Sequence, residues 1–445
     1  MSKTNPKEAG LALARRQFLQ LGAAGLVTTT ALPQAIAAPS KVKSSAKIVI
    51  AGAGAAGLSL ASRLAQQLDG VQITIIDNRT QHYYQPGFTL IGAGIKTADY
   101  VVSQTASYIP AGVKWVQEKV QEIDPESNKV VTGSGQVVPY DFLFVATGLE
   151  LDYEQIQGMD ASLIGKHGIG SIYNGPEAAS ATWQLLSGFS ESGGRGVFTR
   201  PNTEMKCSGA PLKYTFISED RVVRAGTRSK TEIEYFSNNG VLFSVPIVSE
   251  KARMLFQQRD IKTHYNRILT AIDPGKRVAT FTTPDGLEEQ NWDFIHVVPP
   301  MKAPESVRNS PLPWQSGPWA KEGWMEVDKG TLRHLRYPNV FGVGDIAGVP
   351  KGKTAASVKW QAPVAIDHMV ADITGKPSDA VYNGYTSCPM ITKLGQAMLI
   401  EFDYQNNLTP SFPGVIAPLE ELWISWVMKT MGLKPTYISM LRGKA

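Results

Sequence analysis

The stretch KIVIAGAGAAGLSLASRLAQQL, residues 47–68, constrains the fold more than any other part of this 445-residue chain. An apolar, β-branched run ends at Gly52, and a helical pattern of leucines begins after Gly57. A strand, a glycine turn and a helix in this order are typical of a doubly wound α/β domain. The glycines let the backbone approach a pyrophosphate, whose charge the helix N-terminus stabilises. The pattern predicts a dinucleotide site at Gly52, Gly54, Ala55, Ala56 and Gly57.

Three later segments extend this prediction. The strand VQITIID ends in Asp77, 20 residues beyond Gly57, where a carboxylate can accept hydrogen bonds from ribose hydroxyls. YDFLFVATG ends in Gly148, and RYPNVFGVGDIAG carries Asp345 ahead of a helical pattern. Together these segments resemble the disulfide-reductase-like flavoproteins. The resemblance implies FAD, with its ribityl chain near Asp345 and its flavin at the N-terminus of a helix over 353–364, which includes the predicted FAD residues Ala355 and Ala356.

The middle of the chain predicts a second Rossmann-like domain. It spans residues 151–324, between two parts of an FAD-binding domain at 45–150 and 325–380. Residues 190–245 contain no G-x-G-x-x-G between a strand and a helix, so a second pyrophosphate, and with it a nicotinamide nucleotide, is not expected. PNTEMKCSGAPLKYTF, with Cys207, stands there instead. A thiolate beside a flavin is a nucleophile that can pass electrons to it.

Cysteine and histidine are both sparse. Cys207 and Cys388 are the two cysteines, and a purely structural disulfide between them stays open as an alternative. A chain of this length does not need one to hold its core. The six histidines are scattered without metal-ligand spacing, so no metal site is predicted.

Seven segments between residues 47 and 404 extend the resemblance to one family. HYYQPGFTLIGAG, LDYEQIQGM, PNTEMKCSGAPLKYTFISE, HVVPPMKAP, RYPNVFGVGDIAG, KTAAS and YNGYTSCPMIT…EFDY look like sulfide:quinone oxidoreductases, most of all the branch that includes the mitochondrial enzymes. The resemblance implies oxidation of hydrogen sulfide with FAD and quinone. A third cysteine, which many bacterial members use to grow polysulfide chains, is absent, so long-chain polysulfide is not the expected product.

The same resemblance assigns roles to single residues. Cys207 and Cys388 match the redox cysteines, with the persulfide on Cys388 and the flavin adduct on Cys207, and a small nucleophile accepts the outer sulfur. Lys213 matches a lysine beside the active site, although a solvated helix lysine is an equal alternative. The resemblance also places Gln85 and Val120 against FAD and Lys429 near the quinone.

The N-terminal segment LALARRQFLQLGAAGLVTTTALPQAIAAPS predicts a twin-arginine export signal over residues 1–37. Paired arginines precede a modestly apolar run and then small residues. This places the enzyme on the periplasmic side of the inner membrane. Without residues 1–37, which hold four basic residues and one acidic residue, the net charge falls from +5 to +2, too little to predict a nucleic-acid partner.

The C-terminal region, 381–445, predicts a helix that lies on the membrane surface. Its apolar stripe contains two tryptophans, and every charge after Glu421 is basic, which suits an interface with anionic headgroups. Packing of this stripe against the protein's own core is the alternative. The stripe comprises Leu419, Leu422, Trp423, Trp426 and Val427.

The expected fold is therefore α/β, with two Rossmann-like domains and an amphipathic C-terminal segment, in a chain that can form a homo-oligomer. Three rival functions remain. The flavoprotein subunit of a flavocytochrome c sulfide dehydrogenase would not need the C-terminal segment. A type II NADH dehydrogenase should have the second glycine loop. A flavin-binding partner without catalysis would not lose its flavin colour with sulfide.

Overall fold

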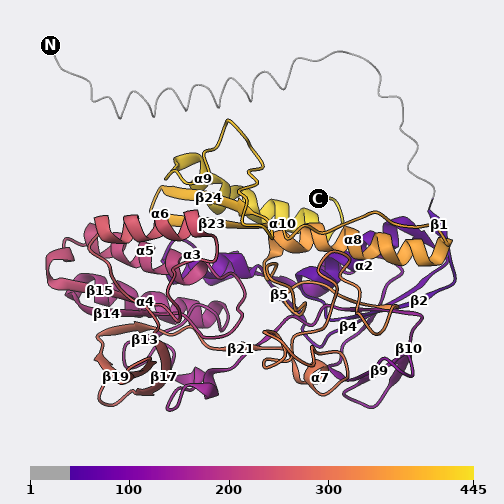
Figure 1. Ribbon diagram of the computed structural model, residues 1–445, viewed down its shortest axis with the longest axis horizontal. Coiled ribbons are helices and arrows are strands. Elements are labelled where there is room, and N and C mark those ends of the chain that lie inside the picture. The colour runs from indigo at the N-terminus through magenta and orange to yellow at the C-terminus, as the bar shows by residue number, and fades with distance from the viewer. Residues whose placement is uncertain (1–40) are drawn as a thin grey trace, which may run out of the picture. The chain divides into compact units, whose positions relative to one another are not determined.

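Two five-stranded sheets, each entirely parallel, organise residues 41–445, the part of the chain that this computed structural model describes (Figure 1). Residues 1–37, the predicted export signal, lie outside the described residues. The first sheet has the order β22-β11-β2-β4-β7. Its strands are β2 (Lys47–Ala51), β4 (Gln72–Ile76), β7 (Lys114–Val116), β11 (Phe142–Val145) and β22 (Val340–Gly342).

Continuous apolar runs form this first sheet because its strands are buried on both faces. Ile48 and Ile50 of β2 have no exposed surface, and Phe144 of β11 stacks on Phe341 of β22 with ring centroids 5.2 Å apart. Helices α2 (Ala55–Gln67) and α8 (Ala355–Thr374) pack against each other beside the sheet (Figure 1). β22, which follows the strands of the second sheet in the sequence, pairs with β11, so the first sheet is formed from two separate parts of the chain.

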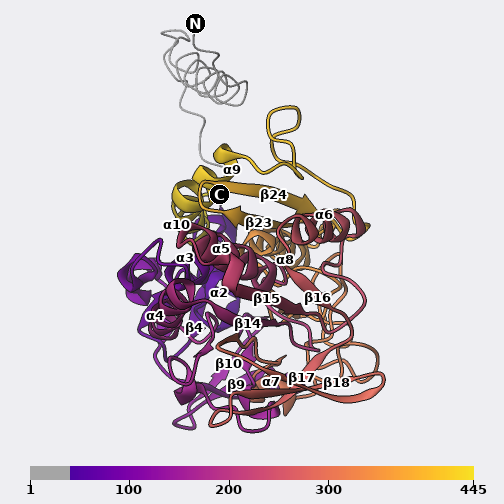
Figure 2. The ribbon, with the colours of Figure 1, turned by 90° about the vertical axis from the view of Figure 1, so that its left-hand side faces the viewer.

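The second sheet has the order β13-β20-β14-β15-β16. Helix α5 (Ala210–Arg224) follows β14, where a nucleotide-binding relative would carry its glycine loop. An antiparallel three-stranded sheet, β17-β18-β19, adjoins it, as Figure 2 shows. The strands and other helices of this half are β13 (Ile169–Gly170), β14 (Gly194–Thr199), β15 (Thr231–Phe236), β16 (Lys262–His264), β17 (Ile268–Asp273), β18 (Val278–Thr283), β19 (Gly286–Asn291), β20 (Phe294–His296), α4 (Pro176–Ser192) and α6 (Pro246–Gln258).

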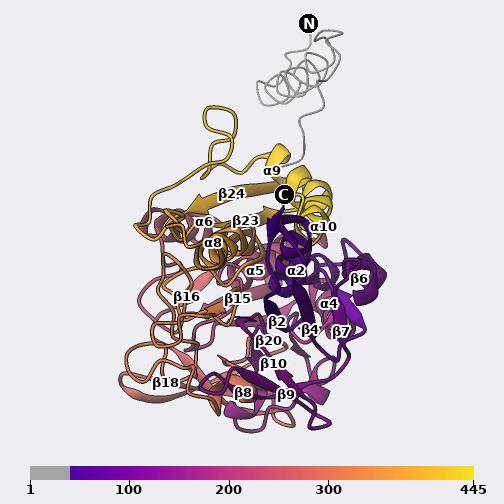
Figure 3. The same ribbon diagram turned by 90° about the vertical axis from the view of Figure 1, so that its right-hand side faces the viewer.

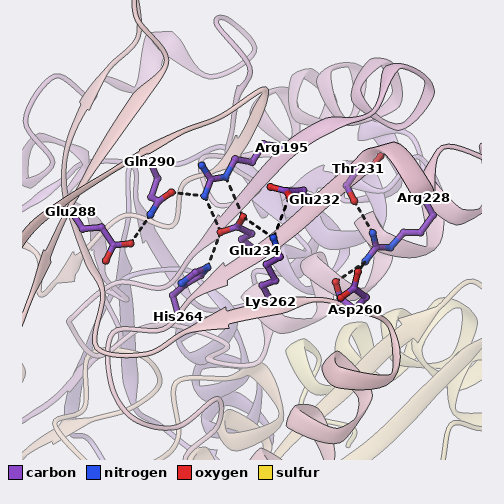
Figure 4. A network of polar contacts seen from close by, with 10 residues as sticks. All are labelled: Arg195, Arg228, Thr231, Glu232, Glu234, Asp260, Lys262, His264, Glu288 and Gln290. Carbon is purple, nitrogen blue, oxygen red and sulfur yellow. Dashed lines mark hydrogen bonds and ion pairs between the residues drawn. The ribbon is translucent and has the colours of Figure 1, made fainter.

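A network of charges crosses three strands of the second sheet (Figure 4). Glu234 of β15, only 2% exposed, accepts a hydrogen bond from Arg195 Nη2 at 3.1 Å and bonds His264 Nε2 at 2.7 Å. Burial alone would raise the pKa of Glu234, but these partners lower it to about 2. The buried carboxylate is thus held ionised by groups on both neighbouring strands.

A hairpin and two short helices from the C-terminal region cover one side of both sheets (Figures 2 and 3). The hairpin β23 (Thr386–Lys393) and β24 (Gln396–Phe402) packs on α5 and α8. After it come α9 (Trp423–Val427), one π-helical turn (Met428–Gly432) and α10 (Leu433–Leu441).

Short elements complete the described chain. They are β1 (Val42–Lys43), β3 (Leu68–Asp69), β5 (Gln81–Tyr83), β6 (Val102–Gln104), β8 (Val120–Asp124), β9 (Lys129–Thr132), β10 (Val137–Pro139), β12 (Glu150–Leu151), β21 (Met301–Lys302), α3 (Phe88–Gly92) and α7 (Glu305–Arg308).

Candidate active site

The fold brings the two cysteines together. Cys207 lies in the loop between β14 and α5, and Cys388 lies on β23, paired with Ile400 of β24. Both are free thiols, and each is the first cause of the shift in the other's pKa. Helix α5 packs on β23, which explains how residues so distant along the chain become neighbours.

Backbone strain and a glycine shape this pair. Cys207 has a φ of +51°, a left-handed conformation that costs a non-glycine residue on the order of 1 kcal/mol. Its N–H donates to the Lys353 carbonyl at 3.0 Å, and its own carbonyl accepts from Ala210 N at 2.7 Å. A Cβ on Gly209 would lie 2.3 Å from Cys388 Sγ, so only glycine leaves room for that sulfur. Strain of this kind is often stored at functional sites.

Two lysines surround the sulfurs. Lys213 of α5 is 2% exposed and directs Nζ at Cys207 Sγ, 3.5 Å away, so it is not a solvated surface residue. Lys429, 3% exposed, donates to the Pro86 carbonyl at 2.7 Å. It comes from the π-helical turn, a feature that often occurs at functional sites. The C-terminal region thus supplies a cation to a site built mainly by the second sheet.

These surroundings shift the pKa values of the two thiols in opposite directions. The hydrogen bond from Cys388 holds the pKa of Cys207 well below its usual value, and Lys213 and Lys429 lower it further, although burial opposes them. The same hydrogen bond and burial raise the pKa of Cys388. Both these directions and the contact of Lys213 Nζ with Cys207 Sγ favour Cys207 over Cys388 as the thiolate of the pair.

The pKa values of Lys213 and Lys429 shift in opposite directions. Burial lowers the pKa of Lys213, but the two sulfurs outweigh burial and raise it overall. Burial and the charge of Lys213 lower the pKa of Lys429 to about 7, despite the opposing cysteines. Lys213 is therefore a permanent cation at neutral pH, whereas Lys429 can release and take up a proton there.

The residues of the predicted dinucleotide site lie at the carboxyl ends of the first sheet. A Cβ on Gly52, whose φ is +105°, would lie 2.5 Å from the Ala146 carbonyl oxygen, and one on Gly57 would lie 1.8 Å from that of Gly52. Gly54 is the N-cap of α2, and Ala55 and Ala56 form its first turn. The backbone is thus close enough to bind a pyrophosphate at a helix N-terminus.

Three polar groups around this turn fit FAD. Asp77 accepts from the Ala53 N–H at 2.7 Å, and Arg79 lowers its pKa against the opposing effect of burial. The buried Thr147 hydroxyl, next to Gly148, has no hydrogen-bond partner among residues 41–445. The Asp345 carboxylate, partly buried, likewise makes no hydrogen bond or ion pair within the described chain. The unpaired Thr147 hydroxyl and Asp345 carboxylate beside a glycine turn are groups that the hydroxyls of FAD require as partners, and Asp77 stands where a carboxylate accepts from a ribose.

The other predicted FAD residues are spread around the same edge. Ala355 and Ala356 begin α8, whose N-cap Thr354 accepts from Ser357 N at 3.1 Å. Val120 begins β8 and is partly buried. Gln85 is exposed, and its Oε1 accepts from Lys206 Nζ at 2.8 Å.

Two lysines near the site, one partly buried and one buried, were missed by the sequence analysis. Lys206, which is partly buried, precedes Cys207, and desolvation lowers its pKa to about 8. Lys353, which precedes α8, donates to the Asp345 carbonyl at 2.6 Å and lies 3.7 Å from the centre of the Trp324 ring. A lysine in a loop is normally solvated, so the sequence offers no signal that these two are buried.

Residues 41–445 contain neither a candidate metal cluster nor a membrane-spanning helix. Within residues 41–445, no three His, Cys, Asp or Glu side chains are grouped to hold a metal ion. No helix in that range combines the length and apolarity that crossing a bilayer requires.

Known proteins share most of this chain. The model of the pyridine nucleotide-disulphide oxidoreductases matches residues 46–174. The mitochondrial sulfide:quinone oxidoreductase of Mus musculus is 36% identical over 370 residues, 82% of this chain and 80% of that protein. Its counterpart in Dictyostelium discoideum is 36% identical over 374 residues, 84% and 81% of the two chains. The solved sulfide:quinone oxidoreductase of the hyperthermophilic bacterium Aquifex aeolicus superposes with a TM-score of 0.72 at 20% identity, over 90% of this chain and 92% of that one.

The predicted periplasmic location is wrong, because relatives that match more than 80% of this chain are named mitochondrial proteins. The pattern on which it rested, in residues 1–37, lies outside the described residues. Arg15 and Arg16 stand in a segment with a single acidic residue. Mitochondrial presequences are also rich in arginine and poor in acids, so this pattern does not separate the two kinds of signal.

The same relatives decide between the functions that the sequence left open. They are named for sulfide and quinone, which favours that reaction over the flavocytochrome c alternative. The Aquifex structure agrees with the predicted α/β class, and the matching oxidoreductase model and the curated relatives agree with FAD as the cofactor. The chain belongs to the sulfide:quinone oxidoreductase family of FAD-dependent enzymes.

Proposed function

We propose that this enzyme oxidises hydrogen sulfide through a reversible disulfide between Cys207 and Cys388. The observation that carries the proposal is the buried ammonium of Lys213, 3.5 Å from Cys207 Sγ, in a site where Cys388 Sγ lies against Gly209, two residues after Cys207. A purely structural bridge would not require a strained Cys207 or a charged lysine in its surroundings. Both features suit a thiolate that forms and leaves during each turnover.

The pKa difference between the thiols supports one direction of attack. Hydrosulfide attacks Cys388 Sγ, the disulfide bond breaks, and its electron pair leaves on Cys207. Cys207 is the better leaving group because its pKa is the lower of the two. Cys388 then carries a persulfide, and Lys213 stabilises the thiolate of Cys207.

A small nucleophile completes the sulfur chemistry. It attacks the outer sulfur, the bond from that sulfur to Cys388 breaks, and the electron pair stays on Cys388 as a thiolate. FAD, when bound, accepts the two electrons released as Cys207 and Cys388 form their disulfide again, and delivers them to quinone. Lys429, with a pKa near 7, is suited to supply a proton to the reduced quinone oxygen.

The C-terminal region is suited to bring this site to a membrane surface. Met431 is 68% exposed and Trp423 38% exposed, next to the turn that carries Lys429. Lys96 and Lys434 each lie over the Tyr100 ring, with Nζ 4.9 and 4.5 Å from its centroid. Exposed apolar groups beside paired cations and an aromatic ring suit the interface of an anionic bilayer, where quinone is dissolved.

The test is an anaerobic assay of the holoenzyme with sulfide. Cys207→Ser and Cys388→Ser should each keep FAD and thermal stability but lose sulfide-dependent reduction of decylubiquinone by at least about a thousandfold. Flavin absorbance reports the sulfide half of the reaction separately. Ser192→Ala, at the end of α4, is the control and should behave as the unaltered enzyme. Turnover retained in either cysteine variant, or faster reduction of cytochrome c than of quinone, would contradict the proposal.

A further inference from the structure

A cavity of about 400 Å³ lies between the end of α3, the segment 94–98 that follows it, and α4. Gly94 and Gln184, both exposed, belong to its lining, so the cavity opens at the surface. Apolar side chains and two polar ones define its character: Ile91, Ile95, Ala98, Trp183, Lys96 and Gln184. A concave site of this size, apolar with a few polar groups, is typical of sites that bind small organic ligands.

Packing around Trp183 gives the cavity a well-supported wall. A Cβ on Gly94, whose φ is +66°, would collide with the indole ring, so glycine lets the backbone lie directly against it. Arg221 of α5 lies over the same ring, with Cζ 4.7 Å from the centroid, and its Nε donates to the Ala93 carbonyl at 3.0 Å. One guanidinium thus holds both the indole and the backbone beside it.

Two ammonium groups meet at Tyr100, next to the cavity. Lys96, a lining residue, has Nζ 4.9 Å from the centroid of the Tyr100 ring, and Lys434 of α10 has Nζ 4.5 Å from it. Lys434 also donates to the Tyr100 carbonyl at 2.5 Å. Asp99 accepts a hydrogen bond from the Thr97 hydroxyl, and neither lysine forms an ion pair with a carboxylate of residues 41–445. Two cations without carboxylate partners favour an anion.

The cavity adjoins the surface that is proposed to face a bilayer. Tyr100 Oη donates to the carbonyl of Thr430 in the π-helical turn at 3.4 Å, and Met431 in the same turn is 68% exposed. Ile95 and Tyr100 pack against the same small apolar core as Trp426 of α9. An amphiphile with one chain in the cavity would therefore keep the rest of its body at the membrane surface.

We propose that this cavity binds an acyl chain of an anionic phospholipid, whose phosphate contacts the ammonium groups of Lys96 and Lys434. The inference rests on the membrane placement in the proposed function, and it names the class of lipid that holds the enzyme there. A neutral quinone would leave the two cations without a partner, and a soluble anion would leave the apolar lining uncovered. A phospholipid satisfies both, because its chain is apolar and its phosphate is charged.

The test uses dihexanoylphosphatidylglycerol, a short-chain anionic phospholipid, titrated as monomers by calorimetry into the FAD-loaded enzyme. It should bind more tightly than dihexanoylphosphatidylcholine, which has the same chains and no net charge. Lys96→Gln and Lys434→Gln should each weaken its binding about fivefold, because one cation near the phosphate is lost. Ala98→Phe, which fills the cavity, should weaken it about tenfold.

Two control variants match these changes. Lys276→Gln removes an exposed lysine in the turn between β17 and β18, and Ala225→Phe adds the same ring at an exposed alanine after α5. Neither should change the binding of the short-chain lipid. Melting temperatures report on folding, and Lys96→Gln keeps the test decisive if Ala98→Phe does not fold.

Vesicles give a second measurement. The enzyme should bind phosphatidylcholine vesicles more tightly when about a fifth of the lipid is phosphatidylglycerol, and Ala98→Phe should reduce this gain. Monomer binding that is unchanged in Ala98→Phe and Lys96→Gln would overturn the inference. Displacement of the bound lipid by decylubiquinone would overturn it too, because the cavity would then hold the quinone. Failure to bind either kind of vesicle would instead refute the membrane placement in the proposed function, with monomer binding still reporting on the cavity.

Discussion

Glu234 lies on β15 of the second sheet, and Cys207 lies in the loop after the neighbouring strand β14. The buried charge of Glu234 has oppositely charged partners, whereas the buried cations around Cys207 have no carboxylate partner within residues 41–445. Glu234 has a hydrogen-bonded partner on each side, Arg195 and His264, and its pKa falls far below the usual value (Figure 4). Around Cys207, Lys213 and Lys429 are buried without any carboxylate partner in the described chain.

This difference in pairing suggests that the Glu234 network contributes to stability and the Cys207 site to reactivity. A fully paired buried charge resists change, because removing one partner leaves the others uncompensated. A cation paired only with a thiol keeps that thiol ionised and available for chemistry. Changes in the Glu234 network should therefore cost stability, and changes around Cys207 should cost turnover.

The largest expected loss of stability is from Glu234→Gln, at about 3 kcal/mol at neutral pH. The pKa of Glu234 is lowered to about 2 from 4.5, so its contribution is fully present above about pH 5 and fades as the pH falls toward 2. Denaturant unfolding of the holoenzyme at several pH values measures the effect. The difference in free energy of unfolding between the variant and the unaltered enzyme should vanish in acid. A difference that does not change with pH would refute the view that ionised Glu234 provides this stability. Glu250→Gln, on the exposed Arg253 pair, should show no measurable change.

Gly209→Ala should lower turnover about a hundredfold, because its Cβ would lie 2.3 Å from Cys388 Sγ and displace that sulfur. FAD content and the sulfide-dependent rate are measured together, with a thiol titration to follow disulfide formation. Gly188→Ala is the matched control, since Gly188 is exposed in α4 with open space around it. It should keep full turnover and stabilise the helix by about 0.5 kcal/mol. Equal turnover in both variants would mean that the space at Gly209 is not required.

Lys213→Met should have the smallest of these effects, about a tenfold slower alkylation of Cys207 in the reduced enzyme at about pH 6. Loss of the ammonium 3.5 Å from the sulfur raises the thiol pKa, so less thiolate is present. Stability should not fall, because a buried charge without a carboxylate partner is removed. A drop in melting temperature as large as that of Glu234→Gln would remove the contrast between the two clusters. Lys262→Met, at the edge of the Glu234 network, is the control and should leave alkylation unchanged.

Much of the fold was predictable because its signals are local. The glycine turn after β2, Asp77 at the end of β4 and the Gly-Asp pair after β22 are each set by a few residues of neighbouring sequence. Strands buried on both faces must be apolar, so their positions are also visible in the composition of short segments. In the C-terminal region, Trp423, Trp426 and Val427 of the expected stripe lie in α9, Leu419 and Leu422 precede that helix, and the π-helical turn that follows had no signal in the sequence.

Two properties of the site required the three-dimensional structure. Nothing in the sequence marks Lys353 as buried or Lys206 as partly buried, because a lysine's solvation depends on segments far along the chain. The order β13-β20-β14-β15-β16 of the second sheet is equally hidden, because the parallel pairing of strands far apart in the sequence is a long-range property.

The sequence by itself determined the α/β class, the dinucleotide turn and the two candidate sulfurs, because backbone conformation and thiol chemistry belong to single residues and their neighbours. Only the tertiary structure decided that both sulfurs belong to one site, that Cys207 is the sulfur next to the Lys213 ammonium, and where Lys429 lies. Distances between β14, β23 and the C-terminal turn control these properties, and electrostatic interactions depend on distance and burial rather than on order along the chain.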